Sequence, residues 1–197
     1  IGHSNTSYLD NNNGTGLSPG TDYCYIIVAD FPDGAESYAS AEVCTLLKKD
    51  LPVITNVSVT ATDVVNGSMY IAWSRPSDLD LNQYPAPHEY RLHRASGTNG
   101  TNFTVVGSTF DLNDTIFNQV NLNTVDNGHR YRVDLYATVN GALQLVGPSA
   151  QASSIFLTIA PTDEKLILNW SVSVPWTNNY FTIFRYNGVS FDSIGFS

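Results

Sequence analysis

The chain has 197 residues and an acidic balance, with 9 Lys and Arg against 18 Asp and Glu and a formal net charge of −9. This balance argues against nucleic acid as a partner, because there is no basic stripe that would displace counterions. Hydrophobic residues make up 42% of the chain, which is enough for a packed core. No apolar run approaches the roughly 20 residues that cross a bilayer, so we expect no transmembrane segment. The chain opens on Ile1 without an initiator Met, which indicates a mature product or an excised piece.

Strand and turn signals recur along the whole length. Thr, Val, Ile, Tyr and Phe occur in short alternating stretches between Asn-Gly, Asp-Gly and Pro-containing turns. This pattern is typical of β-strands and hairpins. We see no convincing helix and expect an all-β protein.

The first expected element is a hairpin. Residues 23–29 alternate as a strand, Asp33-Gly34 marks a turn, and residues 37–46 form the returning strand. Before it, residues 17–23 carry an apolar residue, a tight turn and a Tyr. The same pattern returns 108 residues later at 125–131.

The hairpin holds the only two cysteines. Cys24 and Cys44 lie symmetrically about Gly34, so a regular hairpin places them opposite one another with Cβ atoms about 4.5–5.5 Å apart, close to disulfide spacing. A bridge here would stabilise the fold by roughly 3 kcal/mol and would indicate an oxidising compartment. The alternative is a pair of free buried thiols.

A longer series of strands follows the short polar junction 48–52. It contains about seven strands in roughly 105 residues, with turns at regular spacing, which is the pattern of a two-sheet sandwich. The expected strands are 53–62, 69–73, 90–94, 103–106, 116–122, 131–139 and a last one through Leu145 and Val146 to beyond Pro148.

The chain then starts the same series again. Residues 166–170 repeat the apolar-x-apolar-x-Trp pattern of 69–73, and residues 181–185 repeat the aromatic-x-apolar-x-Arg pattern of 90–94. The passage through 154–160 is nearly seamless, which favours a stiff rod over loosely linked beads.

In their order along the chain, these motifs resemble fibronectin type III domains. That family carries a Trp on its second strand, matched by Trp73 and Trp170, and a third strand matched by 90–94 and 181–185. It also carries a Leu-x-Pro-x-x-x-Tyr corner before its sixth strand. The corner is matched fully by Leu17, Pro19 and Tyr23, and by Val125, Asn127 and Tyr131 with Asn in place of Pro.

The resemblance implies tandem immunoglobulin-like sandwiches, one complete and two partial. We expect the C-terminal half of one module at 1–49, a complete module at 50–154 and the N-terminal half of a third at 155–197. A sandwich needs both sheets to bury its inner faces, so neither half should stand alone. The halves are explained either by a longer array or by ends that complete each other, within one chain or head to tail in a filament.

A narrower resemblance is to tandem modules of large Bacteroidota surface proteins. It is carried by the Cys-containing hairpin, by the loop 79–90 and by the phrase 174–178. Such proteins commonly end in a gliding-motility-associated C-terminal domain and leave by type IX secretion, which implies an extracellular or cell-surface location. Thr115 and Ser193 fit the Asp-Ser/Thr-apolar O-glycosylation tripeptide of that phylum.

One loop carries a superficial calcium pattern. Asp78, Asp80 and Asn82 have alternate-ligand spacing, and Glu89 stands twelfth counting from Asp78. Gln83 stands where a calcium loop needs Gly, so the alternative is a solvated loop. Otherwise we expect no cofactor.

A mixed polar face is expected on the third and sixth strands. If alternate residues point into the core, the residues between them share one outward face. This candidate contact face for protein or glycan consists of Arg91, His93, Arg132, Asp134 and Tyr136. The alternative is ordinary solvated surface. Trp176, in a loop after Pro175, is a further binding candidate.

Catalysis is not expected, because the four histidines fall in unlike segments and no nucleophile, zinc or phosphate motif appears. The sequence favours a non-catalytic spacer whose partners are neighbouring modules of the same protein. The alternatives are an adhesive module that binds an extracellular protein or glycan, and a self-assembling filament subunit.

Overall fold

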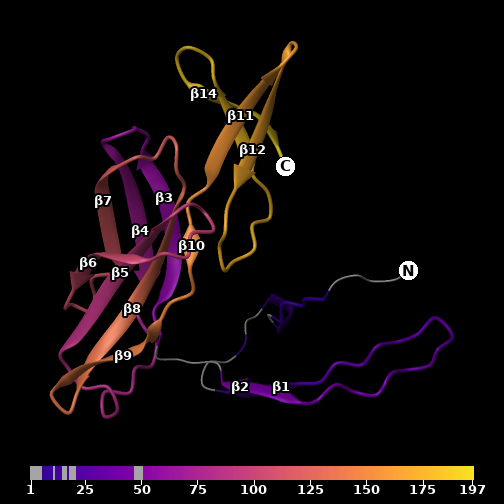
Figure 1. Ribbon diagram of the computed structural model, residues 1–197, viewed down its shortest axis with the longest axis vertical. Helices are drawn as coiled ribbons and strands as arrows, with labels where there is room; N and C mark the ends of the chain where they lie inside the picture. Colours follow the sequence, from indigo (N-terminus) through magenta and orange to yellow (C-terminus); the bar gives the residue numbers. More distant parts are fainter. Residues whose placement is uncertain (1–5, 11, 15–16, 18–20, 47–50) are drawn as a thin grey trace.

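The computed structural model describes residues 6–10, 12–14, 17, 21–46 and 51–197. The described part is all-β, as predicted, and its one helical turn is the short 3-10 segment η1 (Asn12–Gly14). Figure 1 shows a hairpin near the N-terminus, a two-layered body of strands and two further hairpins towards the C-terminus. No helix in these ranges is long and apolar enough to cross a membrane.

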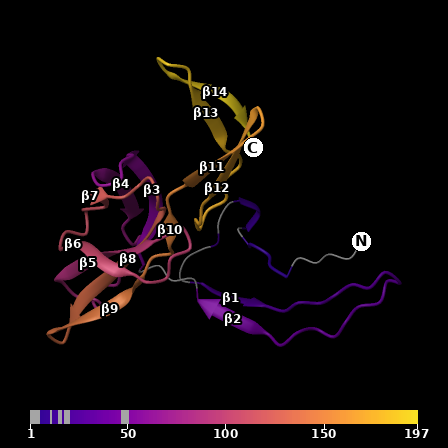
Figure 2. The same ribbon diagram turned by 45° about the horizontal axis from the view of Figure 1, so that its top comes forward.

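The N-terminal hairpin pairs β1 (Asp22–Tyr25) with β2 (Val43–Leu46), and its arms continue side by side beyond the ladder (Figure 2). The turn contains Gly34 at φ +87°, a conformation that favours glycine. The regular ladder covers only residues 22–25 and 43–46, so it is shorter than the predicted strands 23–29 and 37–46.

Two serines explain the shorter ladder. The backbone N–H groups of Ile27 and Ala29 donate to the hydroxyls of Ser40 and Ser37, each at 2.9 Å. The same serines return a backbone bond, Ser40 N–H to Ile27 O at 2.9 Å and Ser37 N–H to Ala29 O at 2.8 Å. Because a hydroxyl replaces one carbonyl in each pair, the arms stay paired without forming a regular sheet.

The central body consists of two antiparallel sheets (Figure 2). The first has the order β3-β4-β7. The second has the order β6-β5-β8, and both β9 and β10 pair with the remaining edge of β8. The bounds are β3 (Val53–Ala61), β4 (Gly67–Ser74), β5 (His88–Ser96), β6 (Thr104–Thr109), β7 (Ile116–Leu122), β8 (His129–Val139), β9 (Ala142–Pro148) and β10 (Ala152–Ser153).

Alternate residues of these strands build one core between the sheets, as the pattern predicts. Trp73 of β4 and Tyr90 of β5 meet edge to face, with ring centroids 5.5 Å apart. The Tyr131 hydroxyl of β8 donates to Gln119 Oε1 of β7 at 2.9 Å, which links the two sheets through the core. The fully buried side chains include Tyr90, Tyr131, Ile54, Met69, Ile71, Leu135 and Val133.

The last strand of the sandwich is broken between β9 and β10. The hairpin into β9 turns at Asn140 and Gly141, both with positive φ, as the Asn-Gly pair predicts. Pro148 ends β9. The backbone N–H of Ser149 then donates a hydrogen bond to Val133 O at 2.7 Å, and the Ser149 hydroxyl accepts one from the Val133 N–H at 3.0 Å. The chain thus stays attached to β8 across the break.

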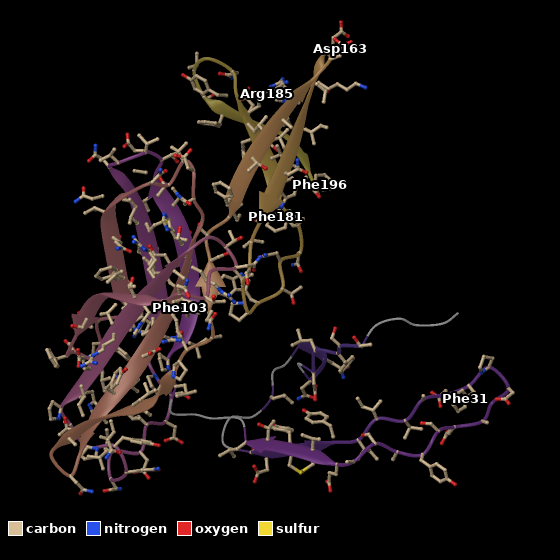
Figure 3. The ribbon with its side chains drawn as sticks, in the orientation of Figure 1. Phe31, Phe103, Asp163, Phe181, Arg185 and Phe196 are labelled. Atoms are coloured by element: carbon tan, nitrogen blue, oxygen red, sulfur yellow. A yellow bond between two sulfur atoms is a disulfide. The ribbon has the colours of Figure 1, made fainter. Side chains whose placement is uncertain are left out.

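Two hairpins follow, and the first begins only two residues after β10. They are β11 (Phe156–Thr162) with β12 (Lys165–Ser171), and β13 (Thr182–Tyr186) with β14 (Phe191–Phe196). Trp170 and Phe181 meet edge to face at 5.6 Å, which repeats the Trp73–Tyr90 contact of the sandwich. Figure 3 shows Phe181, Arg185 and Phe196 on this part of the chain.

Candidate binding face and junction

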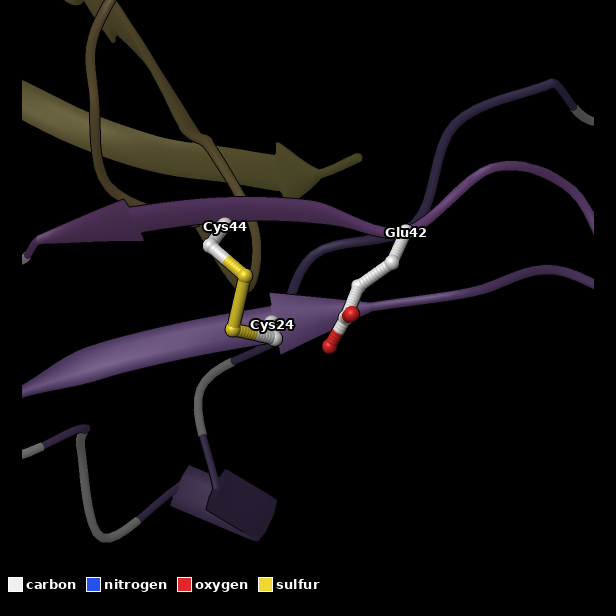
Figure 4. A group of neighbouring side chains, drawn as sticks. All are labelled: Cys24, Glu42 and Cys44. Atoms are coloured by element: carbon white, nitrogen blue, oxygen red, sulfur yellow. A yellow bond between two sulfur atoms is a disulfide. The ribbon is translucent and has the colours of Figure 1, made fainter.

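The predicted disulfide is present. Cys24 and Cys44 are directly paired across β1 and β2 and form a bond with an S–S distance of 2.06 Å. With Glu42 they are the one group of three potential metal-ligating side chains that the described residues bring within 4.8 Å of one another (Figure 4). Because both sulfur atoms are joined to each other, neither is available as a thiolate ligand.

The structure brings the five predicted polar-face residues together. Arg91 and His93 lie on β5, opposite Asp134 and Arg132 of β8 in the strand register, and Tyr136 lies two residues further along β8. Their neighbours Tyr90, Leu92, Val133 and Leu135 fill the core on the other side of the sheet. We call these five residues the polar face.

Asp134 differs from the expectation, because it is only 3% exposed although it lies on the outer side of the sheet. Its carboxylate accepts two bonds from Arg132, at 2.7 and 3.0 Å. His93 Nε2 lies 3.1 Å from Asp134 Oδ2, but the contact is not aligned as a hydrogen bond. Burial lowers the pKa of His93, although the Asp134 carboxylate opposes this shift.

A second carboxylate, which the sequence did not assign to this face, holds the other arginine. Glu89 is 7% exposed and accepts two bonds from Arg91, at 3.0 and 2.9 Å. The Arg91 guanidinium lies 4.5 Å from the centre of the Tyr136 ring, and that of Arg132 lies 5.0 Å from the Phe103 ring. The Glu-x-Arg spacing on one strand was the available signal, since residues two apart share a face.

Each arginine of the polar face is thus joined to a carboxylate and stacked on an aromatic ring. Such paired contacts fix the side chains and leave little free positive charge for an anionic ligand. The arrangement is suited to stiffening the outer side of the sheet. A role of this face in binding stays a prediction.

The loop that carries the predicted calcium ligands uses one of them to stabilise its own turn. Asp80 Oδ1 accepts the backbone N–H groups of Asn82 and Gln83 at 2.9 and 3.3 Å, and Asp80 O accepts that of Tyr84 at 2.8 Å. Neither Asp78 nor Asp80 belongs to a cluster of three ligating groups in the ranges described. The solvated-loop interpretation accounts for this geometry, and calcium binding stays untested.

The two predicted glycosylation positions differ in accessibility. Thr115 is half-buried, and its carbonyl accepts the backbone N–H of Trp73 at 3.0 Å. Ser193 is exposed on β14. Modification at either position stays a prediction.

The sandwich and the C-terminal hairpins meet through polar contacts that the sequence did not reveal. Ser153 N–H donates to Ser173 O at 2.7 Å, and Ser173 N–H donates to the Ser153 hydroxyl at 2.8 Å. The Thr98 hydroxyl donates to that of Ser171 at 3.1 Å, and Val174 packs against the sandwich core. We call these contacts the junction.

Trp176 lies at the junction and not on the polar face. It is a little over one-third exposed and lines a recess of about 230 Å³ together with residues of β3, among them Asn56 and Ser58. The predicted binding residues therefore divide into two separate places.

The comparisons add no relatives. The chain matches no protein-family model and no curated protein.

Proposed function

We propose that the chain is a non-catalytic spacer made of tandem fibronectin type III-like sandwiches in a secreted or surface-anchored protein. The sheet β3-β4-β7 faces a sheet of β6, β5, β8 and the broken last strand β9 and β10, with Trp73 and Tyr131 in the core, and this arrangement supports the fibronectin-like assignment. The disulfide supports an oxidising environment.

The junction is the observation that carries this proposal. Only two residues separate β10, which ends at Ser153, from β11, which begins at Phe156. The backbone of Ser173 both accepts a hydrogen bond from Ser153 and donates one to it. Ser153, just before the connection, is therefore fixed to Ser173, which follows β12. A spacer must keep a fixed length, and a short, hydrogen-bonded connection meets this need better than a flexible linker.

A distance measurement tests the proposal on the full chain. We expect nitroxide labels on Val120→Cys in β7 and Val189→Cys in the last hairpin to give one narrow distance distribution. Adding Val174→Asp should broaden it, because a carboxylate cannot replace the apolar contact with the sandwich core.

Leu143→Asp is the matched control, because this exposed residue lies in β9, away from the junction contacts. It should leave the distance distribution unchanged. A broad distribution in the parent protein would contradict a spacer role.

The recess beside Trp176 favours adhesion as a second candidate function. An exposed Trp next to polar groups is suited to stacking on a sugar ring or inserting between protein side chains. A glycan and matrix-protein binding screen separates the candidates. Saturable binding by the full chain that is lost in Trp176→Ala would support adhesion, and binding that persists in that variant would exclude the recess.

A further inference from the structure

The sandwich shows how strands of this sequence pattern are covered when their partners are present. Leu92 of β5 lies opposite Val133 of β8, and Tyr90 lies opposite Leu135. All four side chains are buried in the core. The complete part of the chain therefore serves as a template for the parts around it.

The face of β11 and β12 that corresponds to the core side of the sandwich is covered only in part. Trp170 packs against Phe181, but the residues farther along this face stay exposed. Leu157, Ile159 and Leu166 are 48%, 56% and 64% exposed. Their counterparts in the template, defined by the strand register, are at most 8% exposed. These counterparts are Ile54, Val57 and Met69.

The N-terminal hairpin also has an exposed apolar face, and it corresponds to the strands of the sandwich that the C-terminal unit lacks. Tyr25 and Ile27 occupy the positions of Val133 and Leu135, at the 108-residue offset of the repeat, yet they are 42% and 74% exposed. The template counterparts are fully buried. Among the described residues no second sheet covers these positions of the hairpin, although the Tyr25 hydroxyl donates a hydrogen bond to Asp10 Oδ2 at 2.9 Å.

The free strand edges match as well. In the template, β5 pairs with β6 on one side and with β8 on the other. Among the described residues, β13 pairs only with β14, and β1 pairs only with β2. The free edge of β13 therefore corresponds to the edge of β5 that pairs with β8, and the free edge of β1 corresponds to the edge of β8 that pairs with β5.

A glycine indicates a further gap in the C-terminal unit. Gly195 pairs with Ile183 as Gly107 pairs with Leu92. At Gly107 an added Cβ would meet the ring of Phe117 at 2.5 Å, whereas nothing lies within 4 Å of the corresponding point at Gly195. The 108-residue offset that relates Ile27 to Leu135 relates the exposed Leu9 to Phe117. Leu9, in the segment before β1, therefore has the position in the repeat that would let its side chain fill the space at Gly195.

We propose that β1 of one copy of this chain pairs with β13 of a second copy, so that the chain associates head to tail. The template register places Tyr25 of β1 opposite Ile183 of β13, and it extends just beyond the two strands to place Ile27 opposite Phe181. The joined sheet has the order β14-β13-β1-β2, and it covers the apolar face of β11 and β12 as β6-β5-β8-β9 covers that of β3 and β4. Because the two surfaces differ, each added copy leaves one of each free, which makes the association open-ended.

The path of the chain favours a second copy over closure within one molecule. The chain enters the sandwich beside Leu51, whose side chain lies against Gly147, the partner of Leu135 on β8. It leaves at Ser154, whose backbone N–H donates a hydrogen bond to His129 O at the other end of β8. The six residue steps of β8 from His129 to Leu135 span about 20 Å, and only residues 47–50 connect β2 to the entrance.

Sedimentation of the full chain tests the proposal. We expect the average mass to rise between about 1 μM and about 1 mM protein. Ile27→Asp and Ile183→Asp should each weaken association at least about 100-fold, because each places a carboxylate in the proposed apolar contact. An equimolar mixture of the two variants should restore association but stop at dimers, since each variant retains one intact surface.

Ile26→Asp is the matched control, because Ile26 is adjacent to Ile27 in the arm that continues β1, should point to the opposite side of that arm, and is also exposed. It should associate as the parent protein does. A parent protein that stays monomeric throughout would overturn the proposal. Association that persists in both Asp variants, or a mixture that gives no dimer, would overturn it as well.

Discussion

At the scale of single residues, Asp134 shows how an outward position can become buried. Its carboxylate lies between the Arg132 guanidinium and the His93 ring, and these side chains together with the sheet exclude water from it. A buried carboxylate that loses its charge leaves its cationic partners without compensation. The polar face therefore contributes to stability through this one residue more than through its exposed members.

We expect Asp134→Asn to destabilise the sandwich by about 2–3 kcal/mol, below the usual cost of breaking a fully buried ion pair because Arg132 retains some contact with solvent. Urea unfolding followed by tryptophan fluorescence measures the change, with Trp170→Phe and Trp176→Phe in the background so that only Trp73 of the core contributes. Asp126→Asn, an exposed acid with one side-chain bond to Asn123, should change stability much less. Equal effects of the two substitutions would contradict the role given to Asp134.

His129 gives a prediction for pH. Burial lowers the pKa of this histidine, Arg94 lowers it further, and the bond to Asn123 O only partly opposes the shift. The unfolded chain therefore binds a proton near pH 6.5 that the folded chain does not. Stability should be highest above that pH and fall as the pH is lowered through it, by at most about 1.4 kcal/mol per pH unit for this group.

The measurement is a series of urea midpoints between pH 7.5 and pH 5. His129→Gln keeps an N–H donor for Asn123 O but cannot titrate, so its midpoints should depend less on pH. His93 contributes in the same direction, because burial also lowers its pKa. An unchanged pH dependence in His129→Gln would show that another group is responsible.

At the scale of elements, the N-terminal hairpin depends on its disulfide. Tyr25, Ile27 and Val43 are exposed, so little apolar burial holds β1 to β2. The Cys24–Cys44 bond closes a loop with a sequence separation of 20, which stabilises by about 3 kcal/mol in the chain-entropy model. The hairpin should therefore lose its order before the sandwich does when the bond is removed.

Replacing both cysteines by Ala should abolish the slow hydrogen exchange of the paired amides in residues 22–46. The amides of β5 and β8 should keep their protection, because their burial does not involve the hairpin. Both regions are read from the same exchange experiment, so the sandwich is an internal control. Loss of protection in β8 would show that the two units fold as one.

The sequence predicted these elements best where alternation and turn chemistry agreed. Residues 116–122 form a strand with the bounds expected, and Asn140-Gly141 makes the expected turn. The cysteine pair was found because its symmetry about Gly34 sets the register directly. Residues 26–29 and 37–42 were assigned to strands wrongly, because alternation does not reveal that the hydroxyls of Ser37 and Ser40 replace backbone carbonyls between these two arms.

The candidate sites were harder to predict, because they depend on contacts between distant parts of the chain. Alternation placed Arg91 and Asp134 on one face, but it could not show that Asp134 is buried. Nothing in the sequence indicated that Ser173 returns to Ser153 across 20 residues. Trp176 was recognised as unusual, but the β3 surface beside it became visible only in the fold.

At the scale of the whole molecule, the chain enters the sandwich at one end and leaves at the other. Figure 1 shows the C-terminal hairpins extending from the sandwich beyond β10. This arrangement, together with the short junction, is the basis of the proposed spacer. The head-to-tail pairing would extend the same succession of units from one molecule to the next.

The position of β3 and β10 has a mechanical consequence. These two strands connect the sandwich to what precedes and follows it, and each is bonded along its length to an inner strand, β4 or β8. Tension applied to the two ends would pull β3 and β10 parallel to their own axes, at right angles to the bonds that hold them. Those bonds would then share the load and break together, and a module held in this way resists stretching better than one that unzips bond by bond.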